Sequence, residues 1–208
     1  MIKTVEKENI SEIIIKKSRF IANMFYIESE EEANTIIKSL KKKYFDAKHN
    51  CYAYRIKDKN SVIEKYSDDG EPSGTAGQPI LNVLRGKELE NVLIIVTRYF
   101  GGILLGTGGL VKAYTESAKD VLENVNIINK EIGMKLKLEI KYNEMENLNY
   151  YMRQNNIKIY KMEFLENIEV YIEITNEKLE KIEKNKNELN FEILEMKIIE
   201  KKCYIIVE

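Results

Sequence analysis

The sequence predicts an α+β fold in two parts, residues 1–125 and 132–208, joined by a linker at 126–131. Three observations support this prediction. The continuous apolar run at 92–96 lies between turn residues, which is typical of a strand buried on both faces at the centre of a sheet. Before residue 125 the apolar period changes repeatedly between that of a strand and that of a helix. After residue 131 the elements follow a β-α-β-β-α-β order, the order of a ferredoxin-like domain.

In the first part, strands are expected at 10–15 and 19–27. The second strand alternates, with the even-numbered residues from Phe20 to Tyr26 on one face and the odd-numbered residues from Ile21 to Phe25 on the other. Ser29, followed by acidic residues, predicts the start of a helix that ends in the basic run at 41–43. A hairpin at 50–56 and 61–66 turns at 57–60. A helix at 79–86, the central strand at 91–99 and a helix at 108–125 complete this part.

In the second part we expect a strand at 132–142, a helix at 144–155, strands at 157–164 and 168–174, a helix at 177–188 and terminal strands between 191 and 207. The linker is placed at 126–131 because these residues break both periods.

Composition excludes several classes of protein. The formal net charge of the 208 residues is −1, which argues against a surface that is basic as a whole and attracts nucleic acid. Cys51 and Cys203 lie far apart and give neither a disulfide framework nor metal-ligand spacing. No apolar run approaches the length of a membrane span. We therefore expect a cytoplasmic protein with no membrane partner.

Nine of the ten glycines lie between residues 70 and 109, which indicates backbone built for tight turns or for close approach of a ligand. A strand, a glycine-rich loop and a helix follow one another here, so an oxyanion such as phosphate is expected at the helix N-terminus. The residues from Gly101 to Gly109 match neither common phosphate-binding fingerprint, which argues against an ordinary nucleotide triphosphatase. Arg98 and Lys112 either add charge to a bound anion or pair with the nearby carboxylates.

The acidic turn of Asp68, Asp69 and Glu71 lacks the spacing of a calcium loop, so turn-making is the expected role of its carboxylates. Ser73 or Thr75 is expected to cap the following helix rather than to act as a nucleophile. His49 is the only histidine, and a hydrogen bond at the rim of the glycine site is its expected role. We expect no catalytic residue, metal or cofactor.

Three segments resemble the signatures of the IMPACT/YigZ family. They are His49-x-Cys51-x-Ala53, the run from Ser67 to Leu81, and the run from Thr97 to Tyr114; the segment 17–20 is also similar. The resemblance implies an N-terminal IMPACT domain with a left-handed βαβ fold like domain 2 of ribosomal protein five of the small subunit. It also implies that the ferredoxin-like C-terminal domain resembles a domain of elongation factor G. Beyond residue 125 the similarity is one of architecture.

The family's eukaryotic members regulate translation by interfering with activation of an initiation-factor kinase, through an additional N-terminal domain that we do not find in this sequence. The kinase pathway is therefore not expected here, and the resemblance implies no established reaction.

Our first hypothesis is a non-enzymatic binding protein linked to translation, with RNA or a ribosome-associated protein as partner. The alternative is an enzyme acting on a small phosphorylated metabolite or nucleotide at the glycine-rich loop, which rests on fold analogy. The expected binding residues are His49, Asp68, Asp69, Glu71, Ser73, Thr75, Arg98, Tyr99, Gly101, Gly102, Gly106, Thr107, Gly108, Gly109, Lys112 and Tyr114.

Overall fold

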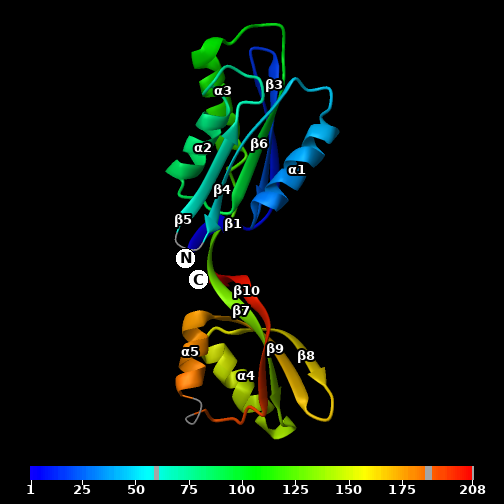
Figure 1. Ribbon diagram of the computed structural model, residues 1–208, viewed down its shortest axis with the longest axis vertical. Coiled ribbons are helices and arrows are strands. Elements are labelled where there is room, and N and C mark those ends of the chain that lie inside the picture. Colours follow the sequence, from blue (N-terminus) through cyan, green and yellow to red (C-terminus); the bar gives the residue numbers. More distant parts are fainter. Residues whose placement is uncertain (59–60, 186–188, 208) are drawn as a thin grey trace. The chain divides into compact units, whose positions relative to one another are not determined.

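A computed structural model describes residues 1–58, 61–185 and 189–207 (Figure 1). The chain divides into two compact units, Ile2–Asn129 and Lys130–Glu208, each of which has its own apolar core. The expected α+β class is confirmed, since both units combine antiparallel strands with helices.

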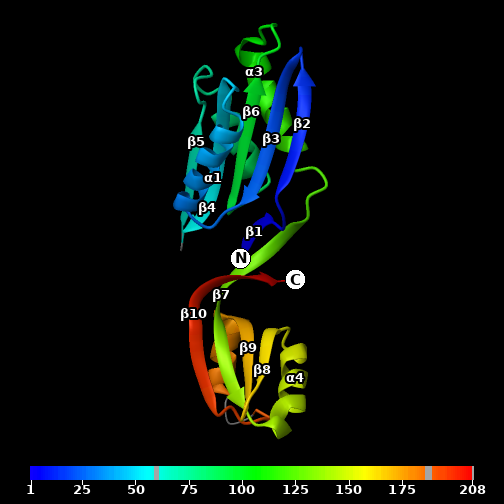
Figure 2. The same ribbon diagram turned by 90° about the vertical axis from the view of Figure 1, so that its right-hand side faces the viewer.

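The N-terminal unit is built on a five-stranded sheet in the order β2-β3-β6-β4-β5 (Figure 2). Its strands are β2 (Asn9–Ile15), β3 (Ser18–Tyr26), β4 (His49–Asp58), β5 (Ser61–Ser67) and β6 (Val92–Tyr99), and each pairs antiparallel with its neighbours. The short strand β1 (Ile2–Val5), which the sequence pattern did not predict, precedes them. As predicted, β6 is the central strand, and all its residues except Tyr99 are buried.

Helices cover both faces of this sheet. On one face, α2 (Gly77–Gly86) and α3 (Gly106–Asp120) pack against the even-numbered apolar residues of β3 and β6. On the opposite face, α1 (Glu30–Lys43) packs against the alternate residues of β4 and β6, including Tyr54, Leu93 and Ile95. The predicted alternation of β3 is confirmed, because Phe20, Ala22 and Met24 lie in the first core and Phe25 contacts the second.

The strand order requires one left-handed crossover. β3 and β4 both run antiparallel to β6 and are therefore parallel to each other, joined through α1. β5 and β6 both run antiparallel to β4 and are joined through α2. From β3 to β4 the chain moves across the sheet in one direction, and from β5 to β6 it moves in the other, along strands that run the opposite way. These two reversals cancel, and a rotation of the sheet in its own plane relates them. Because α1 and α2 lie on opposite faces, the two connections have opposite hands. Since nearly all such crossovers are right-handed, the left-handed βαβ unit is a distinctive feature of this fold.

Local signals explain most helix boundaries. The Ser29 side chain accepts a hydrogen bond from the Glu32 N–H, so the predicted cap of α1 is confirmed. At α2 the prediction of Ser73 or Thr75 as cap was wrong: Ala76 is the N-cap residue, and the Asp68 carboxylate accepts hydrogen bonds from the N–H groups of Ala76 and Gly77. The Asp68 carboxylate takes the role expected of the Ser73 or Thr75 hydroxyl because the turn brings Asp68 close to the start of α2.

The C-terminal unit has the expected β-α-β-β-α-β order. Its elements are β7 (Ile127–Ile140), a 3₁₀ turn η1 (Tyr142–Glu144), α4 (Met145–Gln154), β8 (Lys158–Phe164), β9 (Ile168–Thr175), α5 (Asn176–Lys184) and β10 (Glu195–Val207). The strands lie in the order β10-β7-β9-β8, and α4 and α5 pack on one face through Leu148, Met152, Leu179 and Ile182.

Several boundaries differ from the predictions. β7 begins at Ile127, so residues 127–131, where the sequence pattern places a linker, form part of a strand. The helix expected at 108–125 is α3, which ends at Asp120 and continues as turns. Parts of the turn expected at 57–60 and of the helix expected at 177–188 lie outside the described residues. Among the described helices, none is long and apolar enough to cross a bilayer.

Candidate functional site

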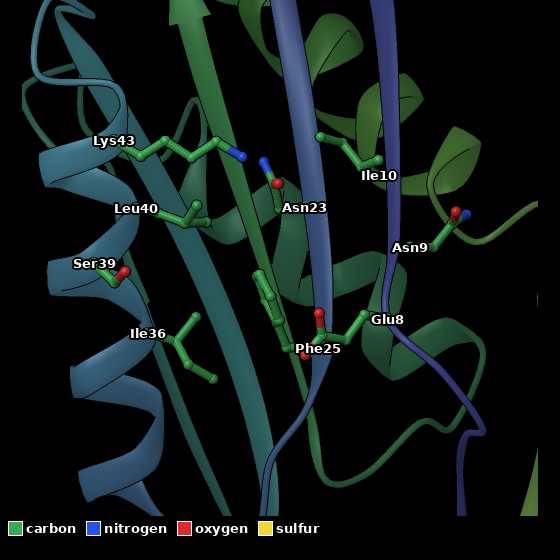
Figure 3. Close-up of a pocket in the computed structure, with 9 residues that line it drawn as sticks. All are labelled: Glu8, Asn9, Ile10, Asn23, Phe25, Ile36, Ser39, Leu40 and Lys43. Carbon is green, nitrogen blue, oxygen red and sulfur yellow. The ribbon is translucent and has the colours of Figure 1, made fainter.

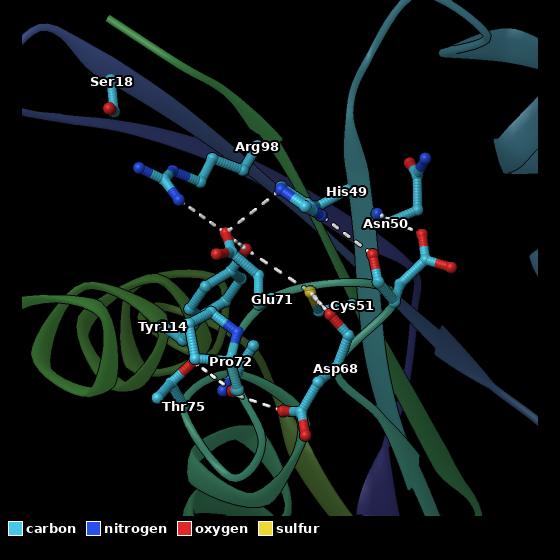
Figure 4. A network of polar contacts seen from close by, with 12 residues as sticks. Ser18, His49, Asn50, Cys51, Asp68, Glu71, Pro72, Thr75, Arg98 and Tyr114 are labelled. Carbon is cyan, nitrogen blue, oxygen red and sulfur yellow. Dashed lines mark hydrogen bonds and ion pairs between the residues drawn. The ribbon is translucent and has the colours of Figure 1, made fainter. Parts of the chain in front are cut away.

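A buried polar network lies between the central strand, the acidic turn and α3 (Figure 4). Glu71 Oε1 accepts hydrogen bonds from Arg98 Nη1 at 2.6 Å and from the Tyr114 hydroxyl at 2.8 Å. The side chains of Arg98 and Glu71 are only 7% and 3% exposed, and Tyr114 is fully buried. Since a buried charge is tolerated only when it is paired, Glu71 and Arg98 depend on each other.

Pairing of the strands brings the network together. His49 at the start of β4 lies opposite Arg98 near the end of β6. The Arg98 guanidinium lies close to two aromatic rings, 5.6 Å from the centre of Phe20 and 5.7 Å from that of Phe100. The Phe20 ring also makes an edge contact with Tyr114. Arg98 Nη1 is directed at Glu71, whereas Nε is buried without an acceptor among the described residues.

Cys51 belongs to the same network as a buried, hydrogen-bonded thiol. Its thiol donates to the Asp68 carbonyl oxygen at 2.9 Å and lies 3.4 Å from the Tyr114 hydroxyl. Burial raises the pKa of the Cys51 thiol and, even more strongly, that of the Tyr114 hydroxyl. Both groups are therefore expected to stay protonated at neutral pH, which argues against a thiolate at Cys51.

The acidic turn is held by its own carboxylates. Asp68 accepts from the N–H groups of Gly74, Ala76 and Gly77 at 2.8–3.0 Å. Asp69 accepts from the Asn50 N–H at 2.7 Å and pairs with Lys41 at 2.5 Å. These two residues shape the turn that carries Glu71, as expected for Asp in turns. Among the described residues, no group of three or more His, Cys, Asp or Glu side chains is arranged to hold a metal.

His49 joins the turn to the network. Its Nδ1 lies 2.8 Å from the Asp69 carbonyl oxygen, which can only accept, so this nitrogen is the donor. Nε2 lies 4.0 Å from Glu71 Oε1. Gly70 takes a φ of +87°, and a Cβ built there meets the imidazole at 3.4 Å. The glycine thus allows the turn to pass over the ring.

The glycine-rich loop has three separate structural roles. A Cβ at Gly101 would lie 2.0 Å from the carbonyl carbon of Lys17, so only glycine fits against the β2–β3 turn. Gly102 and Gly106 adopt φ of +85° and +70°, which glycine takes without strain. Gly108 and Gly109 lie in the first turn of α3, where no side chain caps the helix. The amide groups that begin α3 therefore give this end of the helix a partial positive charge.

A pocket of about 460 Å³ opens between the network and the start of α3. It brings together five of the residues singled out by sequence: His49, Glu71, Arg98, Gly106 and Thr107. The other lining residues were not named individually as binding residues, and only the first of them lies outside the motif segments: Lys48, Gly70, Pro72, Phe100, Leu104, Leu105 and Leu110. Phe100 and Leu104 are 53% and 84% exposed, and the Lys48 side chain is also exposed. The signal available in the sequence was an aromatic residue, Phe100, two positions after Arg98.

The remaining predicted residues do not line this pocket. Ser73 is exposed, and the Thr75 hydroxyl donates to the Pro72 carbonyl within the turn. The Tyr99 hydroxyl donates to Asp46 at the surface. Lys112 extends into solvent and lies 3.8 Å from Glu116 on the same helix. Of the two cations considered for a bound anion, Arg98 and Lys112, only Arg98 lines the pocket. Arg98 pairs with the Glu71 carboxylate, which is the second of the two alternatives that the sequence left open.

Comparison with known proteins identifies the family. Residues 16–122 match the model of the Impact N-terminal domain. IMPACT family member YvyE of Bacillus subtilis is 38% identical over 172 residues, which cover 82% of this chain and 79% of that protein. The chain belongs to the IMPACT family. An IMPACT family member of Haemophilus influenzae is 35% identical, and the match covers 88% of this chain and 91% of that protein.

A solved structure extends the likeness to the whole chain. The crystal structure of a hypothetical protein, 27% identical, superposes with a TM-score of 0.65 over 99% of this chain and 97% of its own. The family model and the two relatives confirm the family resemblance inferred from the sequence motifs.

Proposed function

We propose that this IMPACT family protein is a non-enzymatic binding protein of the cytoplasm that acts in the regulation of translation, and that the pocket at the start of α3 recognises single-stranded RNA. The link to translation rests on the resemblance to a family whose eukaryotic members regulate it. The choice of RNA rests on the chemistry of the pocket.

The observation that carries the proposal is the composition of the pocket rim. The exposed Phe100 ring offers a face on which a base can stack, and the Arg98 guanidinium lies behind that ring. Lys48 supplies a cation, and the first amides of α3 supply donors for a phosphate. With a net charge of −1, the chain as a whole is not basic, so we expect contact with only a few phosphates.

The interior of the pocket supports binding over catalysis. Glu71 is occupied by Arg98 and Tyr114, Cys51 is held as a thiol, and His49 Nδ1 is bonded to backbone. These groups satisfy one another instead of converging on a reacting atom.

The direct test is titration of the full chain with a fluorescent single-stranded RNA at several salt concentrations. Log affinity should fall with log salt at a slope of about −0.7 per phosphate contacted. Phe100→Ala should weaken binding by about 1–3 kcal/mol through loss of stacking. Lys48→Gln should flatten the slope by about one phosphate. Lys181→Gln, at an exposed lysine of α5 that pairs with Glu177, is the control and should change neither quantity. Arg98→Ala is not a clean test, because it would leave Glu71 buried and unpaired.

The alternative is an enzyme acting on a small phosphorylated metabolite or nucleotide. The volume of about 460 Å³ favours it, because it is typical of small-molecule sites. Turnover of such a compound that is lost in His49→Gln, with no RNA or ribosome association in the parent chain, would replace the binding proposal with this one.

A further inference from the structure

A second pocket lies on the opposite face of the same sheet, between α1 and the strands β2 and β3 (Figure 3). Its volume is about 520 Å³, which is within the range of small-molecule sites. The apolar side chains of Phe25, Ile36 and Leu40 form part of its wall. This pocket shares no lining residue with the one proposed for RNA.

The wall of this pocket contains a buried hydrogen-bond donor that lacks a partner. Asn23, in the middle of β3, is only 5% exposed, and its Nδ2 finds no acceptor among the residues that the structure describes. Buried amide groups in native proteins are nearly always hydrogen-bonded, since an unmade bond is costly. An acceptor on a bound ligand would supply the hydrogen bond that Asn23 Nδ2 lacks.

A cation points toward the same place. Lys43, in the last turn of α1, extends its ammonium toward the Asn23 amide (Figure 3). That ammonium lies 5.2 Å from the centre of the Tyr44 ring, a contact that does not neutralise its charge. Two donors, one of them charged, therefore face a single position, and a carboxylate oxygen is the acceptor that would satisfy both.

Glu8 limits the charge of the occupant. In Figure 3 its side chain lies beside Phe25, away from Lys43 along the groove. A second acidic group on a ligand would meet this carboxylate and be repelled. We propose that the groove between α1, β2 and β3 binds a small monocarboxylic acid, with its carboxylate on Asn23 Nδ2 and Lys43 Nζ and its apolar tail on Phe25 and Ile36.

The test uses the full chain and three probes with the same eight-carbon skeleton: octanoate, octanol and suberate. The reporter is the side-chain amide resonance of Asn23 in ¹⁵N-labelled protein. Octanoate should shift that resonance and bind about tenfold more tightly than octanol, because it gains a charge-assisted hydrogen bond. Suberate should bind more weakly than octanoate. Equal binding of octanol, or no shift of the Asn23 resonance with octanoate, would overturn the proposal.

Two variants on α1 distinguish binding at the Lys43 site from nonspecific attraction of octanoate to positive charge. Lys43→Gln removes the proposed partner and should weaken octanoate binding about tenfold. Lys38→Gln makes the same change at an exposed position of α1 that does not line the groove, and should leave the affinity unchanged. Equal loss in both variants would show that octanoate responds only to net charge, which contradicts a built site.

Asn23→Asp supplies the second test, because a carboxylate beside Lys43 should abolish octanoate binding. Its backbone amide spectrum shows whether the fold is kept. If that variant is unfolded, the comparison of Lys43→Gln with Lys38→Gln decides. If Asn23→Asp folds and still binds octanoate like the parent, the proposal is wrong.

Discussion

Tyr114→Phe tests the importance of the buried network most directly. The substitution removes one hydroxyl and leaves the ring, which keeps its edge contact with Phe20 at 5.3 Å between centres. The lost hydroxyl donates to the Glu71 carboxylate at 2.8 Å in a fully buried position. Hydrogen bonds to charged groups contribute about 1.5–3 kcal/mol. We expect the free energy of unfolding of the N-terminal unit to fall by that amount.

Amide hydrogen exchange of β6 (Val92–Tyr99) measures this change without requiring the whole chain to unfold as one unit. Because β6 is the central, buried strand, its slowest amides should exchange through unfolding of this unit. A loss of about 1.5–3 kcal/mol corresponds to exchange about 10- to 150-fold faster.

Tyr99→Phe is the matched control. It removes a tyrosine hydroxyl that also donates to a carboxylate at 2.8 Å, that of Asp46, but in an exposed position. Surface substitutions usually change stability by less than about 0.5 kcal/mol, so exchange should change by about twofold or less. If the two variants accelerate exchange equally, burial of the Glu71 carboxylate is not what gives the network its stabilising effect.

Three further predictions concern the same unit and its boundary. Gly101→Ala should destabilise it by several kcal/mol, because the new Cβ overlaps the Lys17 backbone, whereas Gly108→Ala, with open space around it, should be neutral or stabilising by up to about 1 kcal/mol in thermal melts. Cys51 should resist alkylation by iodoacetamide in the native protein and react after unfolding. Burial raises the pKa of the Cys51 thiol in the folded protein above its value in the unfolded chain. The contribution of Cys51 to the free energy of unfolding should therefore be complete below about pH 8.5 and decline as the pH rises further. A free energy of unfolding that is constant or rises above about pH 8.5 would contradict a raised pKa of Cys51. Brief proteolysis should cut in the irregular residues 123–126 that precede β7 and leave two folded fragments; resistance there, with one cooperative transition, would speak against separate domains.

The sequence by itself determined most of the helices and strands, and it carried the resemblance to the family. The apolar run at 92–96 identified the central strand because a strand buried on both faces has to be apolar at every position. The alternation in β3 and the Ser29 cap identified local structure because these signals act within a few residues. The glycine motifs carried the family resemblance, which the comparisons confirmed.

The sequence pattern also located the pocket approximately but not the roles of its residues. It could not tell whether Arg98 would meet an anion or Glu71, since that depends on pairing between residues 27 positions apart in the chain. It assigned the cap of α2 to a nearby hydroxyl, whereas Asp68 reaches the helix from across a folded turn. It grouped Lys112 with Arg98, although the helix directs Lys112 toward Glu116.

Only the tertiary structure decided what is buried, and burial decided the chemistry. In water, the same Cys, Tyr, Glu and Arg side chains would exchange hydrogen-bond partners freely. Between β6, the acidic turn and α3, these side chains are shielded from water. They keep one arrangement because they can form hydrogen bonds only with one another and with the surrounding backbone. The groove beside Asn23 was equally invisible in the sequence, because it exists only where α1 leaves part of the β2–β3 face uncovered.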